Sequence, residues 1–239
     1  MLIIVIAQEI IYVKCYNLIM KEVMLRILPL LLGAAISPVA TIGMIAVLTS
    51  KYKPKLMGLA FLFGAILPLL IIGIPGIFLF SNLQLKPANS NISSILDLVA
   101  GLLLLGLAIK NFLKKPSNKT SNKPKNHKEL GPAKSFVLGT GLMITNFTTI
   151  ILFIPAVKDI AQSTLSSVEK MTVLFASIPI VMSIIMLPLI IATIMPHSSR
   201  NILENLRVFM TRHNRTIIQA MLLVFGIYLL AKDFGVIAS

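Results

Sequence analysis

Six long apolar stretches dominate the sequence and limit what the chain can fold into. Each is long enough to cross the hydrocarbon core of a bilayer, which takes about 20 residues of α-helix. In lipid the backbone has no water to bond, so stretches of this length are stable there as helices. The sequence therefore predicts an all-α polytopic membrane protein with six transmembrane helices in one bundle. The stretches cover residues 27–49, 56–80, 92–113, 135–157, 171–195 and 216–234.

The composition favours a membrane protein over a soluble one. Hydrophobic residues make up 56% of the chain and charged residues only 13%. A net charge of +14 would suggest nucleic acid as the partner of a soluble protein. Here, however, most Lys and Arg residues fall between the apolar stretches, where they suit anionic lipid headgroups. We therefore expect membrane lipids as partners and no nucleic acid.

The segments between the stretches predict how the chain is divided. Residues 114–134 are rich in Lys, Asn, Ser and Pro and are predicted to form a flexible basic loop. Residues 196–215 have apolar positions at helical spacing and predict an interfacial helix, centred on 199–213. Residues 1–26 hold an apolar run too short to span, and we interpret them as an interfacial extension or a misassigned start. The two predicted three-helix units cover residues 27–113 and 135–239.

The positions of the cations predict the orientation in the membrane, because short loops rich in Lys and Arg stay in the cytoplasm. The first, third and fifth connections between the stretches are rich in Lys and Arg, whereas the second and fourth have little net charge. We therefore predict a plasma membrane protein with its basic loops in the cytoplasm and both termini outside. The basic residues of these loops are Lys51, Lys53, Lys55, Lys114, Lys115, Lys119, Lys123, Lys125, Lys128, Arg200, Arg207, Arg212 and Arg215.

Two parts of the first half recur in the second half. Residues 33–42 (GAAISPVATI) match residues 141–150 (GLMITNFTTI), and residues 107–112 (LAIKNF) match residues 229–234 (LLAKDF). Because each unit has an odd number of helices, the second copy must enter the membrane from the opposite side. This predicts an inverted repeat, an architecture of transporters. The alternative is chance similarity between apolar helices of like composition.

Polar or helix-breaking residues lie at the middle of the first and fourth stretches. Pro38 lacks a backbone donor and clashes with the preceding turn, so carbonyls near Ala34 must find other partners. Hydroxyl and amide groups stand at the same depth in both halves. We predict a substrate site there, formed by Ser37, Pro38, Thr41, Thr145, Asn146 and Thr149. Alternatively, these residues only let the helices pack closely and bond across their interface.

Charged residues are expected only at helix ends or in loops, so no buried carboxylate relay is predicted. Asp97 and Lys232 lie near the ends of stretches, while Lys158 and Asp159 are placed in a loop. Metal transport would need acidic or His ligands at depth, so no metal site and no cofactor are expected. Ser37 has no base that the sequence identifies, so the chain is predicted not to be an enzyme.

The segment GAAISPVATI, followed by a Lys-rich turn and GLAFLFG, resembles the lysine exporter superfamily. It is most similar to the GAP branch, which includes peptidoglycolipid- and sulfolipid-addressing proteins, and residues 206–234 resemble the C-terminal end of that branch. The resemblance implies two three-helix repeats, a polar cytoplasmic loop between them and a role in export. Where the superfamily often has Asn-Pro-Lys, this chain has Asn146, Phe147 and Thr148. The missing Pro and Lys favour a neutral or amphiphilic cargo.

Two functions are consistent with these features. The first is a transporter that exports a small metabolite or a (glyco)lipid by alternating access at the midplane site. The second is an adaptor whose basic cytoplasmic segments bind anionic lipid or a biosynthetic enzyme, while the bundle only anchors it. A polar cavity lined by the predicted site residues would favour transport, and a centre filled by apolar side chains would favour the anchor. Faces with small residues, including Gly58, Gly64, Gly101 and Gly106, suit close helix packing, and such faces favour a homodimer.

Overall fold

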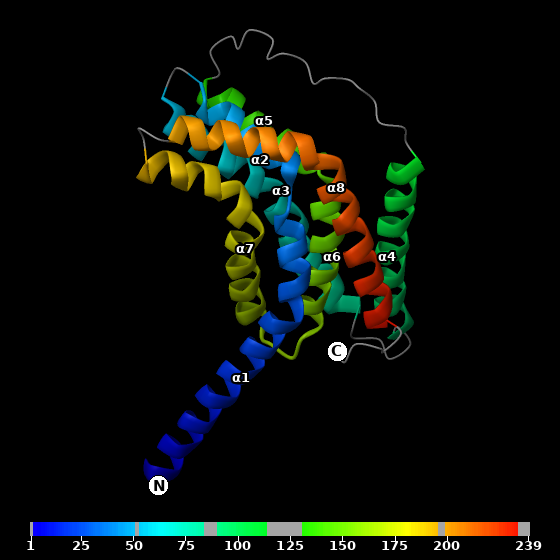
Figure 1. Cartoon of the computed structure of the whole chain (residues 1–239). Helices are drawn as coiled ribbons and strands as arrows, with labels where there is room; N and C mark the ends of the chain where they lie inside the picture. The colour runs from blue at the N-terminus through cyan, green and yellow to red at the C-terminus, as the bar shows by residue number, and fades with distance from the viewer. Residues whose placement is uncertain (1, 51–52, 84–89, 114–130, 196–198, 234–239) are drawn as a thin grey trace.

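The computed structural model describes the chain except for residues 1, 51–52, 84–89, 114–130, 196–198 and 234–239. The described residues form helices and no strand, which confirms the all-α prediction (Figure 1). The predicted flexible loop falls almost wholly within residues 114–130 and so lies outside the described part. The helices are α1 (Leu2–Ala35), α2 (Pro38–Leu48), α3 (Pro54–Leu83), α4 (Ser90–Leu113), α5 (Pro132–Ile144), α6 (Phe147–Gln162), α7 (Ser167–Ile194) and α8 (Ser199–Asp233).

Four of these helices, α3, α4, α7 and α8, are long and apolar enough to cross a membrane on their own. The first and fourth predicted stretches are instead broken into helix pairs. The α1–α2 pair bends by 58° and the α5–α6 pair by 72°. If each bent pair counts as one span, the described chain has up to six spans. The protein is therefore a multi-pass membrane protein.

The first break follows directly from the sequence. Pro38 is the first residue of α2, where its missing N–H would have had no helical partner. Ser37 caps the new helix, because its side-chain oxygen accepts a hydrogen bond from the backbone N–H of Ala40 at 3.4 Å. The second break lies at Asn146, whose ψ of 73° is outside the helical range. No proline causes this break.

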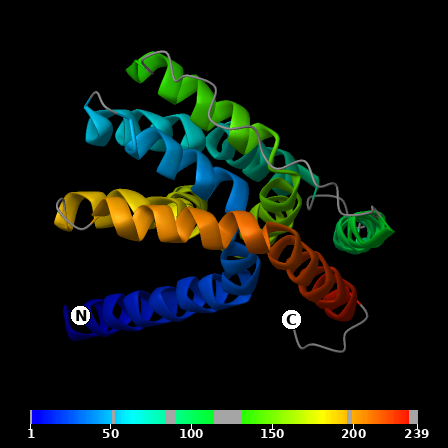
Figure 2. The ribbon, with the colours of Figure 1, turned by 45° about the horizontal axis from the view of Figure 1, so that its top comes forward.

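Two helices run further than the sequence predicted. The structure joins the predicted surface helix and the last stretch into one helix, α8. The first part of α8 lies across one end of the bundle, and the rest runs alongside α4 (Figure 1). At the other end of the chain, α1 begins at Leu2, extends beyond the bundle and continues without a break into the first stretch. Figure 2 shows that α2, α5 and the first part of α8 share one end of the molecule.

Most of the interior is apolar and tightly packed. Phe61, Met44 and Phe153 are fully buried, whereas many apolar side chains face outward, as expected in lipid. The α3 and α5 backbones touch: a Cβ on Gly64 would lie 2.1 Å from the Phe136 carbonyl oxygen, and one on Gly139 would lie 2.1 Å from the Phe61 carbonyl oxygen. Small residues thus allow close helix packing within the chain, as predicted for Gly58, Gly64 and Gly101. The prediction is wrong for Gly106, because no atom of the described residues lies within 4 Å of a Cβ there.

Candidate functional site

The two helix breaks meet in the interior. The side-chain amide of Asn146 donates hydrogen bonds to Ser37 Oγ at 2.6 Å and to Thr149 Oγ1 at 2.7 Å. Ser37 is only 2% exposed. The bond to Ser37 links positions 109 residues apart, one in each half of the chain. The breaks therefore form one polar centre rather than two separate ones.

The carbonyl group that Pro38 leaves without a helical partner is satisfied by the other half of the chain. Thr149 Oγ1 donates a hydrogen bond to the Ala34 carbonyl oxygen at 2.8 Å. Thr41 Oγ1 donates to the Ser37 carbonyl oxygen, also at 2.8 Å. Thr41 and Thr149 are both buried. The Thr149 bond connects the α1–α2 break to the first turn of α6, while the Thr41 bond lies within the first turn of α2.

Thr145, by contrast, bonds within its own helix. Its hydroxyl is 2.9 Å from the Gly141 carbonyl oxygen and 3.1 Å from that of Leu142. Five of the six predicted site residues thus gather at the polar centre, with Pro38 beginning α2 among them. Thr145 lies beside it and is exposed.

A pocket of about 330 Å³ opens next to the polar centre, between α2, α4, α5, α6 and α8. Only two of the predicted site residues, Thr145 and Asn146, line it; Ser37, Thr41 and Thr149 are buried and are not part of its lining. A volume of this size suits a small ligand or part of a larger one. We name this cavity the Lys110 pocket. Its lining residues are Val39, Leu107, Lys110, Asn111, Leu142, Thr145, Asn146, Phe147, Thr148, Ile218 and Leu222.

Lys110 is the one charged residue in this lining, and the sequence did not identify it as a site residue. It comes from the last turn of α4. Arg215 of α8 binds the same helix end, donating hydrogen bonds to the carbonyl oxygens of Asn111 at 2.7 Å and Phe112 at 3.2 Å. Cations at a helix C-terminus interact favourably with its unpaired carbonyls. The pocket therefore combines a cation, amide and hydroxyl groups, and apolar walls.

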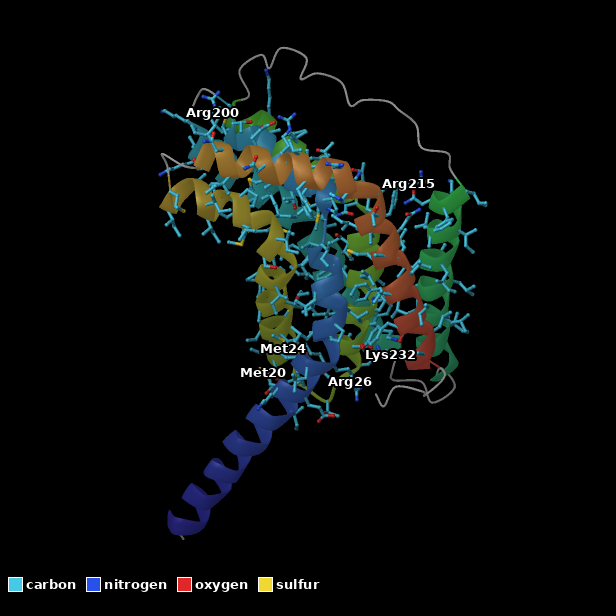
Figure 3. The ribbon with its side chains drawn as sticks, in the orientation of Figure 1. Met20, Met24, Arg26, Arg200, Arg215 and Lys232 are labelled. Atoms are coloured by element: carbon cyan, nitrogen blue, oxygen red, sulfur yellow. The ribbon has the colours of Figure 1, made fainter. Side chains whose placement is uncertain are left out.

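A second polar assembly lies where α4, α6 and α8 meet. We call Asp97, Lys158, Asp159 and Lys232 the ion cluster. Lys158 Nζ is 2.5 Å from Asp97 Oδ2, and Lys232 Nζ is 2.6 Å from Asp159 Oδ2. Cross contacts at 3.5 Å (Lys232–Asp97) and 3.7 Å (Lys158–Asp159) complete the cluster. In Figure 3, Lys232 lies at the end of the bundle opposite Arg200 and Arg215.

The prediction that Lys158 and Asp159 lie in a loop is wrong. Helix α6 continues through both residues to Gln162, and the side chain of Lys158 is only 2% exposed. Asp97 is buried as well. The hydropathy of the fourth stretch falls at Val157 because charged residues follow, but those charges pair with α4 and α8 and need not leave the bundle. In the described residues, no three His, Cys, Asp or Glu side chains gather as metal ligands would.

The sequence model of a family described as "Sap, sulfolipid-1-addressing protein" matches residues 27–234. The chain belongs to the sulfolipid-1-addressing protein family. The resemblance inferred from the sequence is thereby confirmed. Comparison with curated proteins and with solved structures gives no match.

The family match includes both helix breaks, the Lys110 pocket and the ion cluster. In this member of the sulfolipid-1-addressing protein family, the position after Asn146 and Phe147 is Thr148 rather than a lysine. The structure nevertheless brings a lysine to the same pocket, from α4 instead of α6. A cation thus lines the same pocket as Asn146, although the local motif lacks one.

Proposed function

We propose that this sulfolipid-1-addressing family member translocates an amphiphilic lipid with an anionic headgroup across the plasma membrane. The observation that carries the proposal is the Lys110 pocket, where polar groups of the α5–α6 break lie beside a lysine and apolar walls. The family description names a sulfolipid, which is an anionic amphiphile of this kind. The substrate class is thus proposed from the chemistry of the pocket and supported by the family.

The lining divides into two parts that suit the two ends of such a lipid. Lys110, Asn111, Thr145, Asn146 and Thr148 offer positive charge and hydrogen-bonding groups for a sulfate, phosphate or sugar headgroup. The remaining side chains are apolar and suit the first carbons of an acyl chain. These apolar residues are Val39, Leu107, Leu142, Phe147, Ile218 and Leu222.

Alternating access is supported by where the helices break. The α1–α2 and α5–α6 breaks fall within the matched segments 33–42 and 141–150. Discontinuous helices in corresponding positions of two halves commonly surround the substrate in transporters. We therefore interpret the fold as six spans in two inverted three-helix repeats. The halves would rock about the Ser37–Asn146 contact.

The orientation of the pocket follows from the charges. Arg200 and Arg215 lie at one end of the bundle (Figure 3), and Arg215 bonds to α4 directly beside the Lys110 pocket. The positive-inside rule places this end in the cytoplasm. The structure would then represent an inward-facing state, ready to take a lipid made inside the cell.

A second candidate, the membrane adaptor, is favoured by the first part of α8. Val208 and Phe209 are more than half exposed there, and Arg200 and Arg212 are exposed on the same segment. This segment suits an anionic membrane surface. The adaptor predicts that replacing Arg200 and Arg212 by Gln abolishes function while Asn146→Leu does not, and transport predicts the reverse.

The test compares lipid and metabolite pools of cells with and without the gene, separating inside, outer-leaflet and medium fractions. We expect an anionic amphiphile to stay inside when the gene is deleted and to reach the outside again when the wild-type protein is restored. Asn146→Leu should fail to restore it. Asn201→Leu, the same exchange at an exposed site on α8, should succeed. Equal pools under several growth conditions would contradict transport and leave the adaptor.

A further inference from the structure

We propose that the ion cluster is a closed gate over a second half-site, the counterpart of the Lys110 pocket at the opposite end of the bundle. This inference rests on the alternating access proposed above. It assigns the cluster a role that goes beyond holding helices together: in the other state of the cycle, the cluster would open while the Lys110 pocket closes.

The matched helix ends carry the argument. Residues 107–112 align with residues 229–234, so Lys110 corresponds to Lys232 and Leu107 corresponds to Leu229. Lys110 is exposed and lines the open pocket, while the side chain of Lys232 is 9% exposed and bonded to Asp159. Leu107 lines the pocket too, but Leu229 is fully buried. Equivalent residues therefore line an open pocket at one end of the bundle and are buried at the other end.

Helices α4 and α8 contribute to the two sites in a reciprocal way. The Lys110 pocket is formed where the end of α4 meets the middle of α8, through Ile218 and Leu222. The ion cluster forms where the end of α8 meets the first half of α4, through Asp97. An inverted repeat predicts this exchange, because α4 and α8 are the third helices of the two units.

The four charges of the ion cluster are not the side chains that would stabilise the buried helix contact most, and this suits a contact that separates during the cycle. Burying four charges costs solvation energy that apolar side chains of similar size would not lose. Asp97 Oδ1 is buried and has no hydrogen-bond partner among the described residues. Ionisable residues within a membrane-spanning bundle commonly mark a functional pathway. Once separated, the same charges would be stabilised by water and would line a polar opening.

Water has a short route to this gate. A surface pocket of about 220 Å³ includes Asp159 in its lining, together with Glu22 and Arg26 of α1. Figure 3 shows Arg26 at the same end as Lys232. Asp159 therefore belongs both to the buried cluster and to a surface cavity. Opening would need only the separation of the α4, α6 and α8 ends around it.

The experiment measures the accessibility of both ends without any substrate. Cys15→Ser provides a background for a single cysteine at Leu107 or at Leu229, and a water-soluble maleimide is added to the protein in lipid nanodiscs. With the cluster intact, the cysteine at 107 should react and the one at 229 should be protected. Asp97→Asn leaves the cluster with an excess positive charge, and should raise the labelling rate at 229 by at least about tenfold. The rate at 107 should fall in parallel.

Matched variants separate a gate from a local defect. Asp97→Glu keeps the charge and should keep 229 protected. Glu204→Gln removes an exposed carboxylate from its pair with the partly exposed Arg207 and should change neither rate. If Asp97→Asn does not fold, the double change Asp97→Asn with Lys158→Met leaves no excess charge and should give the same reciprocal shift.

Two results would overturn the gate. Protection of the cysteine at 229 both in Asp97→Asn and in the double change Asp97→Asn with Lys158→Met would mean that the cluster does not close this end. A rise at 229 with no fall at 107 would mean that the cluster only stabilises the fold locally. Because no lipid is moved in this assay, a failed gate and a failed transport proposal give different results.

Discussion

Asn146 donates a 2.6 Å hydrogen bond to Ser37 and so joins two helix breaks that are far apart in the sequence. Together with the bond from Thr149 to the Ala34 carbonyl oxygen, it links the α1–α2 break to the start of α6 through two hydrogen bonds. Backbone groups freed by a broken helix in a membrane must be satisfied by neighbours or water. The α1–α2 break therefore depends on a side chain from the other half of the chain.

Replacing Thr149 by Val should destabilise the protein by about 1–3 kcal/mol, because the buried Ala34 carbonyl oxygen would lose its side-chain donor without a change in side-chain shape. The free energy of unfolding can be measured by titrating a folded sample in mixed micelles with denaturing detergent. Thr172→Val is the matched control, since Thr172 is exposed and bonds only to Val168 in its own helix. An equal effect of both changes would contradict the special role of Thr149.

Replacing Lys110 by Gln should lower the affinity for anionic amphiphiles by at least about tenfold, because a charge-assisted contact is lost from the pocket. Lys110→Arg keeps the charge and should retain most of the binding. Affinity can be read from the shift in thermal unfolding when lipids with anionic or zwitterionic headgroups are added. Unchanged discrimination between the two headgroups in Lys110→Gln would remove this residue from the proposed site.

The sequence predicted the polar centre better than the pocket or the cluster. Pro38 removes a backbone donor at the middle of an apolar stretch, and Asn146 is a polar residue at the same depth, so both positions stand out in the sequence. Proline alone does not predict a break, because Pro68 and Pro188 lie inside continuous helices. Lys110 was not conspicuous, because a lysine at the end of an apolar stretch normally reaches toward the headgroups. Lys158 was missed for a related reason: hydropathy along one segment cannot reveal that Asp97 and Asp159 compensate its charge from across the bundle.

The ion cluster should show strong coupling in a double-mutant cycle. Lys158→Met alone leaves an excess negative charge among side chains that are less than a tenth exposed, and should cost about 3–5 kcal/mol. Asp97→Asn combined with Lys158→Met removes one negative and one positive charge, and should cost much less than the sum of the single changes. Unfolding free energies of the four proteins test this. Additive losses would show that the 2.5 Å contact between Lys158 and Asp97 contributes no coupling.

The close approach of α3 and α5 should make Gly64 intolerant of any side chain. A Cβ at this position would lie 2.1 Å from the Phe136 carbonyl oxygen, so Gly64→Ala must push two backbones apart. We expect a loss of about 1–3 kcal/mol, measured as a lower midpoint of thermal unfolding. Gly106→Ala is the control, because no atom lies within 4 Å of a Cβ there. That change should be neutral or stabilising by up to about 1 kcal/mol, since alanine favours a helix over glycine. If Gly64→Ala were equally neutral, the backbones would not be in contact in the membrane, and the α3–α5 packing beside the second break would have to be looser than the structure indicates.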